Sequence, residues 1–139
     1  MKLYRLFACA LTAVALSLTA SAADSTPLED QMEKLSKALK LVKRNLADAS
    51  AKDANLAKIA DAKAALGEAK KLEPAMTKTI PAGQKEKFLT DFKASIEETG
   101  KALDELKAAI EAGKSEEAAK VMEKLDLQKK ESHKKFKEE

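Results

Sequence analysis

The sequence predicts an all-α fold, an antiparallel up-down-up-down four-helix bundle. The first reason is composition: the 139 residues are rich in Ala, Lys, Leu and Glu, with no Trp and only 4% aromatic residues. Such a composition is typical of helices. The second reason is that apolar residues recur at helical spacing along four segments, which are separated by capping and helix-ending residues. The connections between the segments are short or moderate, so successive helices are expected to be antiparallel neighbours.

The first expected helix opens at Thr26-Pro27-Leu28-Glu29, where Thr26 and Glu29 match a capping box and Pro27 suits the first helical position. The second is expected to begin at a cap on Ser50 or Asp53 and to run to about Leu72, before Glu73-Pro74. A longer loop with Met76 follows. The apolar residues of the first helix alternate in four-three spacing: Leu28, Met32, Leu35, Leu39, Val42 and Leu46. Those of the second are Leu56, Ile59, Ala62, Leu66 and Ala69.

The third expected helix ends before Gly113, and Ser115 is the expected cap of the fourth. We expect the four helices to be of similar length. The inward residues of the third helix are Phe88, Phe92, Ile96, Thr99, Leu103, Leu106 and Ile110. Those of the fourth are Ala118, Met122, Leu125, Lys129, His133 and Phe136.

The first 22 residues have the pattern of a secretory signal peptide. Lys2 and Arg5 supply the positive start, an apolar run follows over residues 6–18, and Ala20-Ser21-Ala22 is a small-x-small cleavage site. We therefore expect a mature chain of residues 23–139 that forms one four-helix domain in the periplasm. No later stretch is long enough to span a membrane, so no membrane insertion is expected after cleavage.

The expected mature chain has nearly balanced charge. Removing residues 1–22 takes away two of the 26 basic residues and none of the 23 acidic residues, which leaves a net charge of +1. Composition therefore does not favour nucleic-acid binding. The single cysteine, Cys9, lies in the signal segment, so no thiol remains for a disulfide or a thioether link to a cofactor. The charged outward faces show no second apolar seam, which predicts a monomer.

One end of the expected bundle gathers unusual side chains. The alternating direction brings the start of the first and third helices together with the end of the second and fourth. Met32 lies five residues after Pro27, and His133, the only histidine, lies six residues from the last residue, so both face inward at similar depth. The aromatic residues of the mature chain lie at this end too: Phe88, Phe92 and Phe136.

Two interpretations of this end remain open from the residues alone. In the first, His133 and Met32 simply pack in the core. In the second, they bind a metal: a thioether and an imidazole are an axial pair for low-spin haem iron, and phenylalanines suit a large flat apolar group. Zinc requires more ligands, and a di-iron site requires inward Glu and Glu-x-x-His motifs. Copper bound by Met and His is possible but leaves the phenylalanines unexplained.

Several segments resemble the soluble periplasmic cytochrome b562 family over nearly the whole mature chain. They are residues 28–35, Phe88-x-x-x-Phe92, Glu111-Ala112-Gly113-Lys114 and Ser132-His133-Lys134-Lys135-Phe136. The family is a standard example of the up-down-up-down bundle. The resemblance implies one non-covalent haem b per chain, with Met32 and His133 as the axial iron ligands. The absence of Cys-x-x-Cys-His agrees with a non-covalent haem. The other expected cofactor-binding residues are Leu28, Leu35, Phe88, Phe92, Lys129 and Phe136.

The resemblance implies a periplasmic one-electron carrier, not an enzyme, with no catalytic residues and with redox partner proteins that the sequence does not identify. The alternative is a cofactor-free periplasmic bundle that acts as a chaperone or binding module. Lysines surround the predicted site: Lys129, Lys130, Lys134, Lys135 and Lys137. They either guide an acidic redox partner or suit the helix dipole and solubility.

The sequence departs from the family pattern beside His133. The family often has arginines near the ligand histidine, whereas this chain has Lys129 and Lys137 one turn before and one turn after it. Lysine is a poorer bidentate partner for a carboxylate than arginine. Lys129 either meets a haem propionate or extends to water. We therefore expect weaker haem retention than in arginine-bearing relatives.

Overall fold

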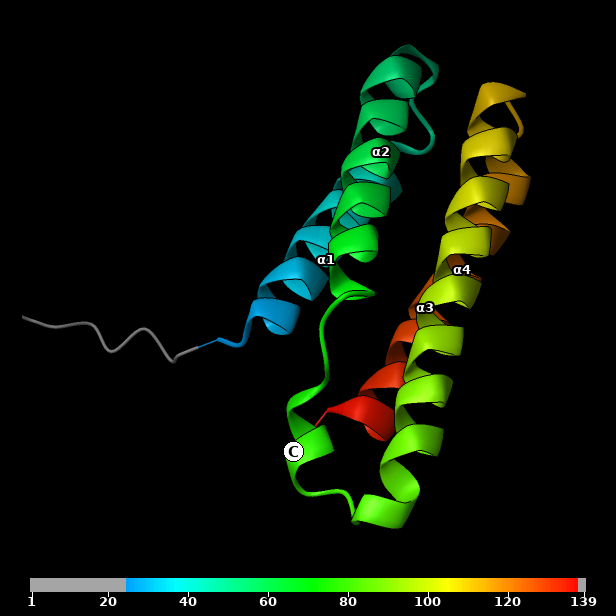
Figure 1. The fold of residues 1–139 in the computed structure, drawn as a ribbon. Helices are drawn as coiled ribbons and strands as arrows, with labels where there is room; N and C mark the ends of the chain where they lie inside the picture. The colour runs from blue at the N-terminus through cyan, green and yellow to red at the C-terminus, as the bar shows by residue number, and fades with distance from the viewer. Residues whose placement is uncertain (1–24, 138–139) are drawn as a thin grey trace, which may run out of the picture.

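The computed structural model of the protein describes residues 25–137, so the predicted signal peptide over residues 1–22 lies outside the described part. The described chain confirms the all-α antiparallel four-helix bundle (Figure 1). The α-helices are α1 (Pro27–Asn45), α2 (Lys52–Ala69), α3 (Ala82–Glu111) and α4 (Ser115–Phe136), and two short 3-10 helices precede α2 and α3: η1 (Ala49–Ala51) and η2 (Ala75–Lys78). No helix within residues 25–137 has the length and apolar character that crossing a membrane requires.

The predicted capping box starts α1. The backbone N–H of Glu29 donates to Thr26 Oγ1 at 3.2 Å, and the backbone N–H of Thr26 donates to Glu29 Oε2 at 2.9 Å. Pro27 lies in the first turn of α1, where a backbone N–H has no partner within the helix. Its lack of an N–H therefore costs no hydrogen bond. These local interactions fix the residue at which α1 begins, and therefore the depth of Met32 in the bundle.

The predicted caps of α2 and α4 are wrong. Asp48 accepts from the backbone N–H of Ser50 at 2.9 Å and opens η1, and α2 then continues without a side-chain cap. Aspartate readily binds the N–H two residues further on, which makes it a turn former as well as a cap. Ser115 is the first residue of α4, and its preceding residue, Lys114, makes no side-chain cap hydrogen bond. Helix α2 also ends at Ala69, three residues earlier than expected.

The expectation of four similar helices fails for α3, which has 30 residues against 19 in α1, 18 in α2 and 22 in α4. Its first turns, before Phe88, are mostly exposed and so leave no apolar periodicity in the sequence. Its end follows the prediction: Gly113 has φ +70°, the left-handed conformation that glycine adopts without strain after a helix.

The core runs along the bundle axis but is not equally closed on all sides. Helix α1 packs closely on α2, α3 packs on α4, and α2 packs on α3, whereas α1 and α4 touch least of the adjacent pairs. Fully buried residues include Val42, Ile59, Leu103 and Leu106, far from the end that carries the phenylalanines. The open side between α1 and α4 is therefore the place where the fold leaves room for a ligand.

Candidate functional site

The open side of the bundle contains a cavity of about 790 Å³. Side chains from α1, α3 and α4 line it, and Pro74 and Ala75 at the start of the η2 segment close part of its wall. Its apolar lining includes Leu28, Met32, Phe92, Ile96 and Phe136. The volume lies within the range of about 300–1,000 Å³ that is usual for sites of small molecules and cofactors.

The structure brings most of the predicted site residues together on this cavity. The six that line it are Leu28, Met32, Phe92, Lys129, His133 and Phe136. Leu35 lines a smaller adjoining pocket of about 100 Å³, whose wall also includes Met32 and His133. Phe88 lines neither space, although the sequence pattern predicted it as a cofactor-binding residue.

Phe88 instead supports the cavity wall through Phe136. The ring centroids of Phe88 and Phe136 are 5.4 Å apart with an interplanar angle of 66°, and those of Phe92 and Phe136 are 5.4 Å apart with an angle of 74°. Both are edge-to-face arrangements, in which the partly positive edge of one ring contacts the partly negative face of the other. Phe136 is buried between two rings of α3, so the last turn of α4 is fixed on α3 beside the cavity.

His133 lines the cavity but is not enclosed by the core. The helical pattern placed it on the inward stripe of α4 with Leu125 and Phe136, and these two are buried, whereas the His133 side chain is exposed. The reason is the sparse packing between α1 and α4, which leaves this part of the stripe facing the open side. His133 is therefore accessible both to solvent and to anything that enters the cavity.

The surroundings of His133 favour the neutral imidazole. Partial burial lowers its pKa below the ordinary value of 6.5, and the positive charges of Lys129 and Lys137 lower it further. Desolvation and like charge both destabilise the imidazolium form. A neutral imidazole has a free nitrogen lone pair, so His133 is suited to metal binding near neutral pH.

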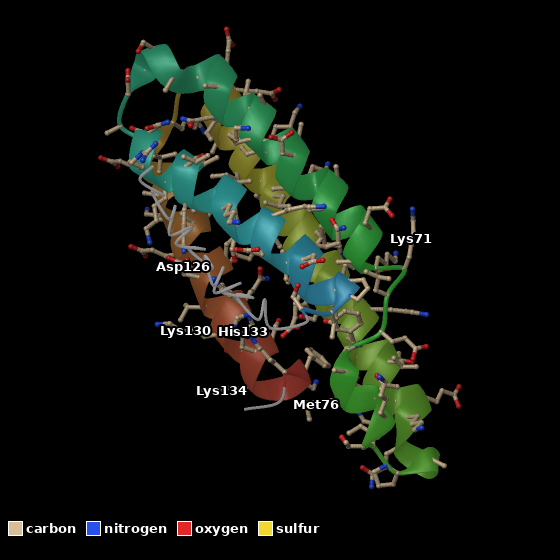
Figure 2. All side chains as sticks on the ribbon, turned by 90° about the vertical axis from the view of Figure 1, so that its left-hand side faces the viewer. Lys71, Met76, Asp126, Lys130, His133 and Lys134 are labelled. Carbon is tan, nitrogen blue, oxygen red and sulfur yellow. The ribbon has the colours of Figure 1, made fainter. Side chains whose placement is uncertain are left out.

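Met32 supplies the second soft donor from the opposite helix. It lies in α1, is half-buried and packs against the core. Because Met32 and His133 line both the cavity and the smaller pocket, a thioether and an imidazole from two different helices border the same space. Met76 is another methionine near this end of the bundle: it lies in η2, beside the C-terminal end of α4 in Figure 2, but it does not line the cavity.

Two ion pairs connect the α1 and α4 sides of the bundle, one beside the cavity and one beside the smaller adjoining pocket. Glu29 Oε1 lies 3.6 Å from Lys137 Nζ, and Lys43 Nζ lies 2.6 Å from Asp126 Oδ2. Met32 lies between the α1 members of these pairs in the sequence, and His133 lies between the α4 members. The two ion pairs thus fix the position of α1 along α4, and the space between the two helices stays open.

Sequence reasoning predicted Thr99 as an inward residue, and Thr99 lines the cavity, but it missed two serines there. Ser95 of α3 and Ser132 of α4 both line the cavity, and their side-chain oxygens are 2.7 Å apart in a hydrogen bond. Neither lies on an apolar stripe. The available signal was that small polar residues replace the Lys and Glu that are typical of the outer faces of these helices. Pro74 and Ala75 also line the cavity, but they belong to no apolar helical pattern, so periodicity did not predict them.

Comparison with known proteins identifies the family. A sequence model of cytochrome b562 matches residues 27–137, which is the segment from the start of α1 to the residue after α4. Searches among curated proteins and among solved structures found no match. The chain therefore belongs to the cytochrome b562 family, whose members are haem-carrying electron-transfer cytochromes.

Proposed function

We propose that the protein is a periplasmic b-type cytochrome that carries one electron on a single non-covalent haem, with Met32 and His133 as axial iron ligands. The observation that supports this most directly is that Met32 of α1 and His133 of α4 line one cavity on the open side of the bundle. The family match supports a haem protein and does not depend on this cavity.

The residues of the cavity fit a haem. A haem is a large flat apolar group with two carboxylates, and the cavity combines about 790 Å³ with apolar walls from α1, α3 and α4. Lys129 lines it and has no carboxylate partner among residues 25–137, so its charge is available to a propionate. A bound haem would supply an iron that alternates between the ferrous and ferric states.

The protein side chains would determine how that iron behaves. The neutral imidazole of His133 would donate a nitrogen lone pair to it, and the thioether of Met32 would favour the reduced iron and so raise the potential. With both residues bound to the iron, no position would remain there for a substrate, so the site would support electron transfer and not catalysis. The expected mature chain, residues 23–139, contains no cysteine, which is consistent with a haem held without covalent links.

The test is titration of the purified mature chain with hemin. We expect one equivalent to produce the Soret band and the visible bands of a low-spin haem. Absence of a Soret band at saturating hemin would reject the proposal and favour a cofactor-free bundle that acts as a chaperone or binding module. Fractionation of cells that produce the full chain tests the periplasmic location, because recovery of uncleaved protein in the cytoplasm would contradict it.

A further inference from the structure

The cavity of about 790 Å³ adjoins the smaller pocket of about 100 Å³, and some residues line both spaces. Met32 and His133 are two of them. The others are all polar, and we name them the pocket boundary: Ser36, Lys40, Thr99, Lys129 and Ser132. Hydrogen-bond donors from α1, α3 and α4 therefore meet where the two spaces join.

The two lysines of the pocket boundary come from opposite helices, Lys40 from α1 and Lys129 from α4. Neither forms an ion pair with a carboxylate among residues 25–137. Lys43 and Asp126 also line the smaller pocket, but they pair with each other at 2.6 Å. The lining of this pocket therefore carries two positive charges without a partner and no carboxylate without one.

The carboxylates that line the large cavity have other partners. Glu29 pairs with Lys137 at 3.6 Å, and Glu33 pairs with a lysine of the next turn at 2.8 Å. Asp30 has no cationic partner among the described residues, but it accepts a hydrogen bond from Ser25 Oγ at 2.5 Å and does not line the smaller pocket. An acid group at the pocket boundary therefore meets uncompensated positive charge without a competing carboxylate of the lining.

The hydroxyls of the pocket boundary differ in their availability. Thr99 Oγ1 donates to the backbone carbonyl of Ser95 at 3.0 Å, and the Ser132 and Ser95 hydroxyls are hydrogen-bonded at 2.7 Å. The half-buried Ser36 side chain has no hydrogen-bond partner among residues 25–137. It lies one turn before Lys40 on the same face of α1, so its hydroxyl is free to donate to a group that Lys40 holds.

We propose that the pocket boundary is a carboxylate subsite, where Lys40 and Lys129 hold one acid group of the molecule in the large cavity and Ser36 donates a hydrogen bond to it. This rests on the proposed function, because it assigns a place to one haem propionate. Bonds from an ammonium to a carboxylate are stronger than those between neutral groups. The pocket has room for the acid group, since about 10–15 Å³ already holds a water.

The apolar walls of the large cavity favour an amphipathic molecule over a free small anion. Phe92, Ile96 and Phe136 line that cavity, and a free anion at the pocket boundary would leave them without contact. A molecule with an apolar body and a carboxylate uses both parts of the space. It would also connect α1 to α4 on the side where these helices touch least.

The two lysines repel each other in the ligand-free protein, because both border a space of only about 100 Å³. A carboxylate between them replaces this repulsion with attraction. Substitution of either lysine should therefore raise the stability of the ligand-free protein and lower its affinity for the ligand. A lysine whose stem merely packs on the helices would instead lower the stability when it is replaced.

The probes are iron-free protoporphyrin IX and its dimethyl ester, because neither requires an iron ligand and only the first has free carboxylates. Porphyrin fluorescence during titration of the haem-free mature chain gives both dissociation constants. We expect the natural chain to bind the free acid more tightly than the ester. Lys40→Gln and Lys129→Gln should each weaken binding of the free acid about threefold and leave binding of the ester unchanged. Ser36→Ala should produce a smaller loss with the same preference.

The matched controls are Lys34→Gln on α1 and Lys120→Gln on α4, at exposed lysines that line neither space. Both should bind the two probes as the natural chain does. Thermal unfolding at low salt should give a higher Tm for ligand-free Lys40→Gln and Lys129→Gln than for the natural chain. Equal loss of affinity in the controls, an equal loss for the ester, no binding of the free acid, or a lower Tm for both subsite variants would overturn the proposal.

Two further outcomes identify what has failed. If hemin gives no low-spin spectrum but binding of protoporphyrin IX depends on both lysines, the proposed function fails and the carboxylate subsite stands. Sodium acetate is the probe for a free carboxylate. Chemical-shift changes at Lys40 and Lys129 that saturate with acetate, together with equal affinities for the free acid and the ester, would overturn the proposal and assign the pocket to a free anion.

Discussion

Glu29, in the first turn of α1, and Lys137, the residue after α4, form an ion pair beside the cavity with 3.6 Å between Oε1 and Nζ. The other oxygen of the same carboxylate accepts from the backbone N–H of Thr26 at 2.9 Å. One side chain thus caps α1 and links it to the end of α4. Since α1 and α4 otherwise touch little, Glu29 helps to hold the start of α1, which carries Met32, beside the end of α4, which carries His133.

The two roles of Glu29 are separable by substitution. Glu29→Ala removes both the cap acceptor and the ion pair, and we expect it to lower the free energy of unfolding by about 1 kcal/mol, the usual effect of losing a helix cap. Lys137→Ala removes only the ion pair, whose side chains are 55% and 44% exposed, so its effect should be well under about 1 kcal/mol. Urea unfolding followed by circular dichroism measures both. Equal losses would mean that the ion pair, and not the cap, is the important interaction.

Acid should weaken the contribution of Glu29. The hydrogen bond from the Thr26 backbone lowers the pKa of Glu29 below its ordinary 4.5, partial burial opposes this, and Lys137 lowers it further. A carboxyl group with a lower pKa in the folded state stabilises the fold above about pH 4.5, and this stability is lost as the pH falls through the folded value. The difference in unfolding free energy between the natural protein and Glu29→Gln should therefore be larger at pH 7 than at pH 3. A difference that stays constant would contradict the assignment.

Substitution of the proposed ligands should abolish the low-spin haem spectrum. His133→Ala removes the imidazole, and Met32→Leu removes the sulfur while nearly conserving volume. The matched control is Met122→Leu, because Met122 is buried and lines the smaller adjoining pocket but is not a proposed ligand. Optical spectra of hemin-loaded protein provide the measurement. If Met32→Leu kept the low-spin bands while Met76→Leu lost them, Met76 would be the ligand.

The sequence predicted those features of the fold that depend on local chemistry. The Thr26–Glu29 capping box, the Gly113 end of α3 and most of the buried stripes follow from interactions within a few residues, and the structure confirms them. The exceptions are Lys129 and His133, which were predicted to face inward on the fourth helix and are exposed. The caps proposed at Ser50, Asp53 and Ser115 were wrong because turn-forming residues also bind nearby backbone groups in other ways.

The site was harder to predict than the fold. Helical periodicity correctly brought Met32, His133 and Phe136 to one end, but it assumed equal packing on all sides of the bundle. It therefore gave no sign that α1 and α4 separate, or that Phe88 acts through Phe136 instead of lining the cavity. Helix separation and the Ser95–Ser132 bond depend on contacts between distant segments, which no single helical pattern records.

Haem retention should depend on Lys129 more than on Lys137. Lys129 lines the cavity without a carboxylate partner, whereas Lys137 already pairs with Glu29. Arginine binds a carboxylate through two parallel hydrogen bonds, so Lys129→Arg should slow haem loss severalfold if this residue meets a propionate. Transfer of haem to excess apomyoglobin measures the rate, with Lys137→Arg as the matched control. A Lys129→Arg rate equal to that of the natural protein would indicate that Lys129 extends to water.

The lowered pKa of His133 is directly measurable in the haem-free protein. Because His133 is the only histidine, its imidazole protons give one unambiguous titration curve by nuclear magnetic resonance. We expect a pKa below the unperturbed value of about 6.5. Lys129→Gln should raise that pKa by removing a positive neighbour, whereas Lys93→Gln on α3 should leave it unchanged.

The same titration affects stability and haem binding in the same direction. Since the folded pKa of His133 is below the unfolded one, the unfolded chain takes up its proton first as the pH falls below about 6.5, and the folded haem-free protein loses stability there. If His133 binds the haem iron as proposed, a proton must compete with the iron for the imidazole, so haem should leave only at still lower pH, with uptake of one proton at His133. Parallel records of Soret absorbance and proton uptake test this. Haem release without proton uptake would show that His133 is not the group that holds the iron.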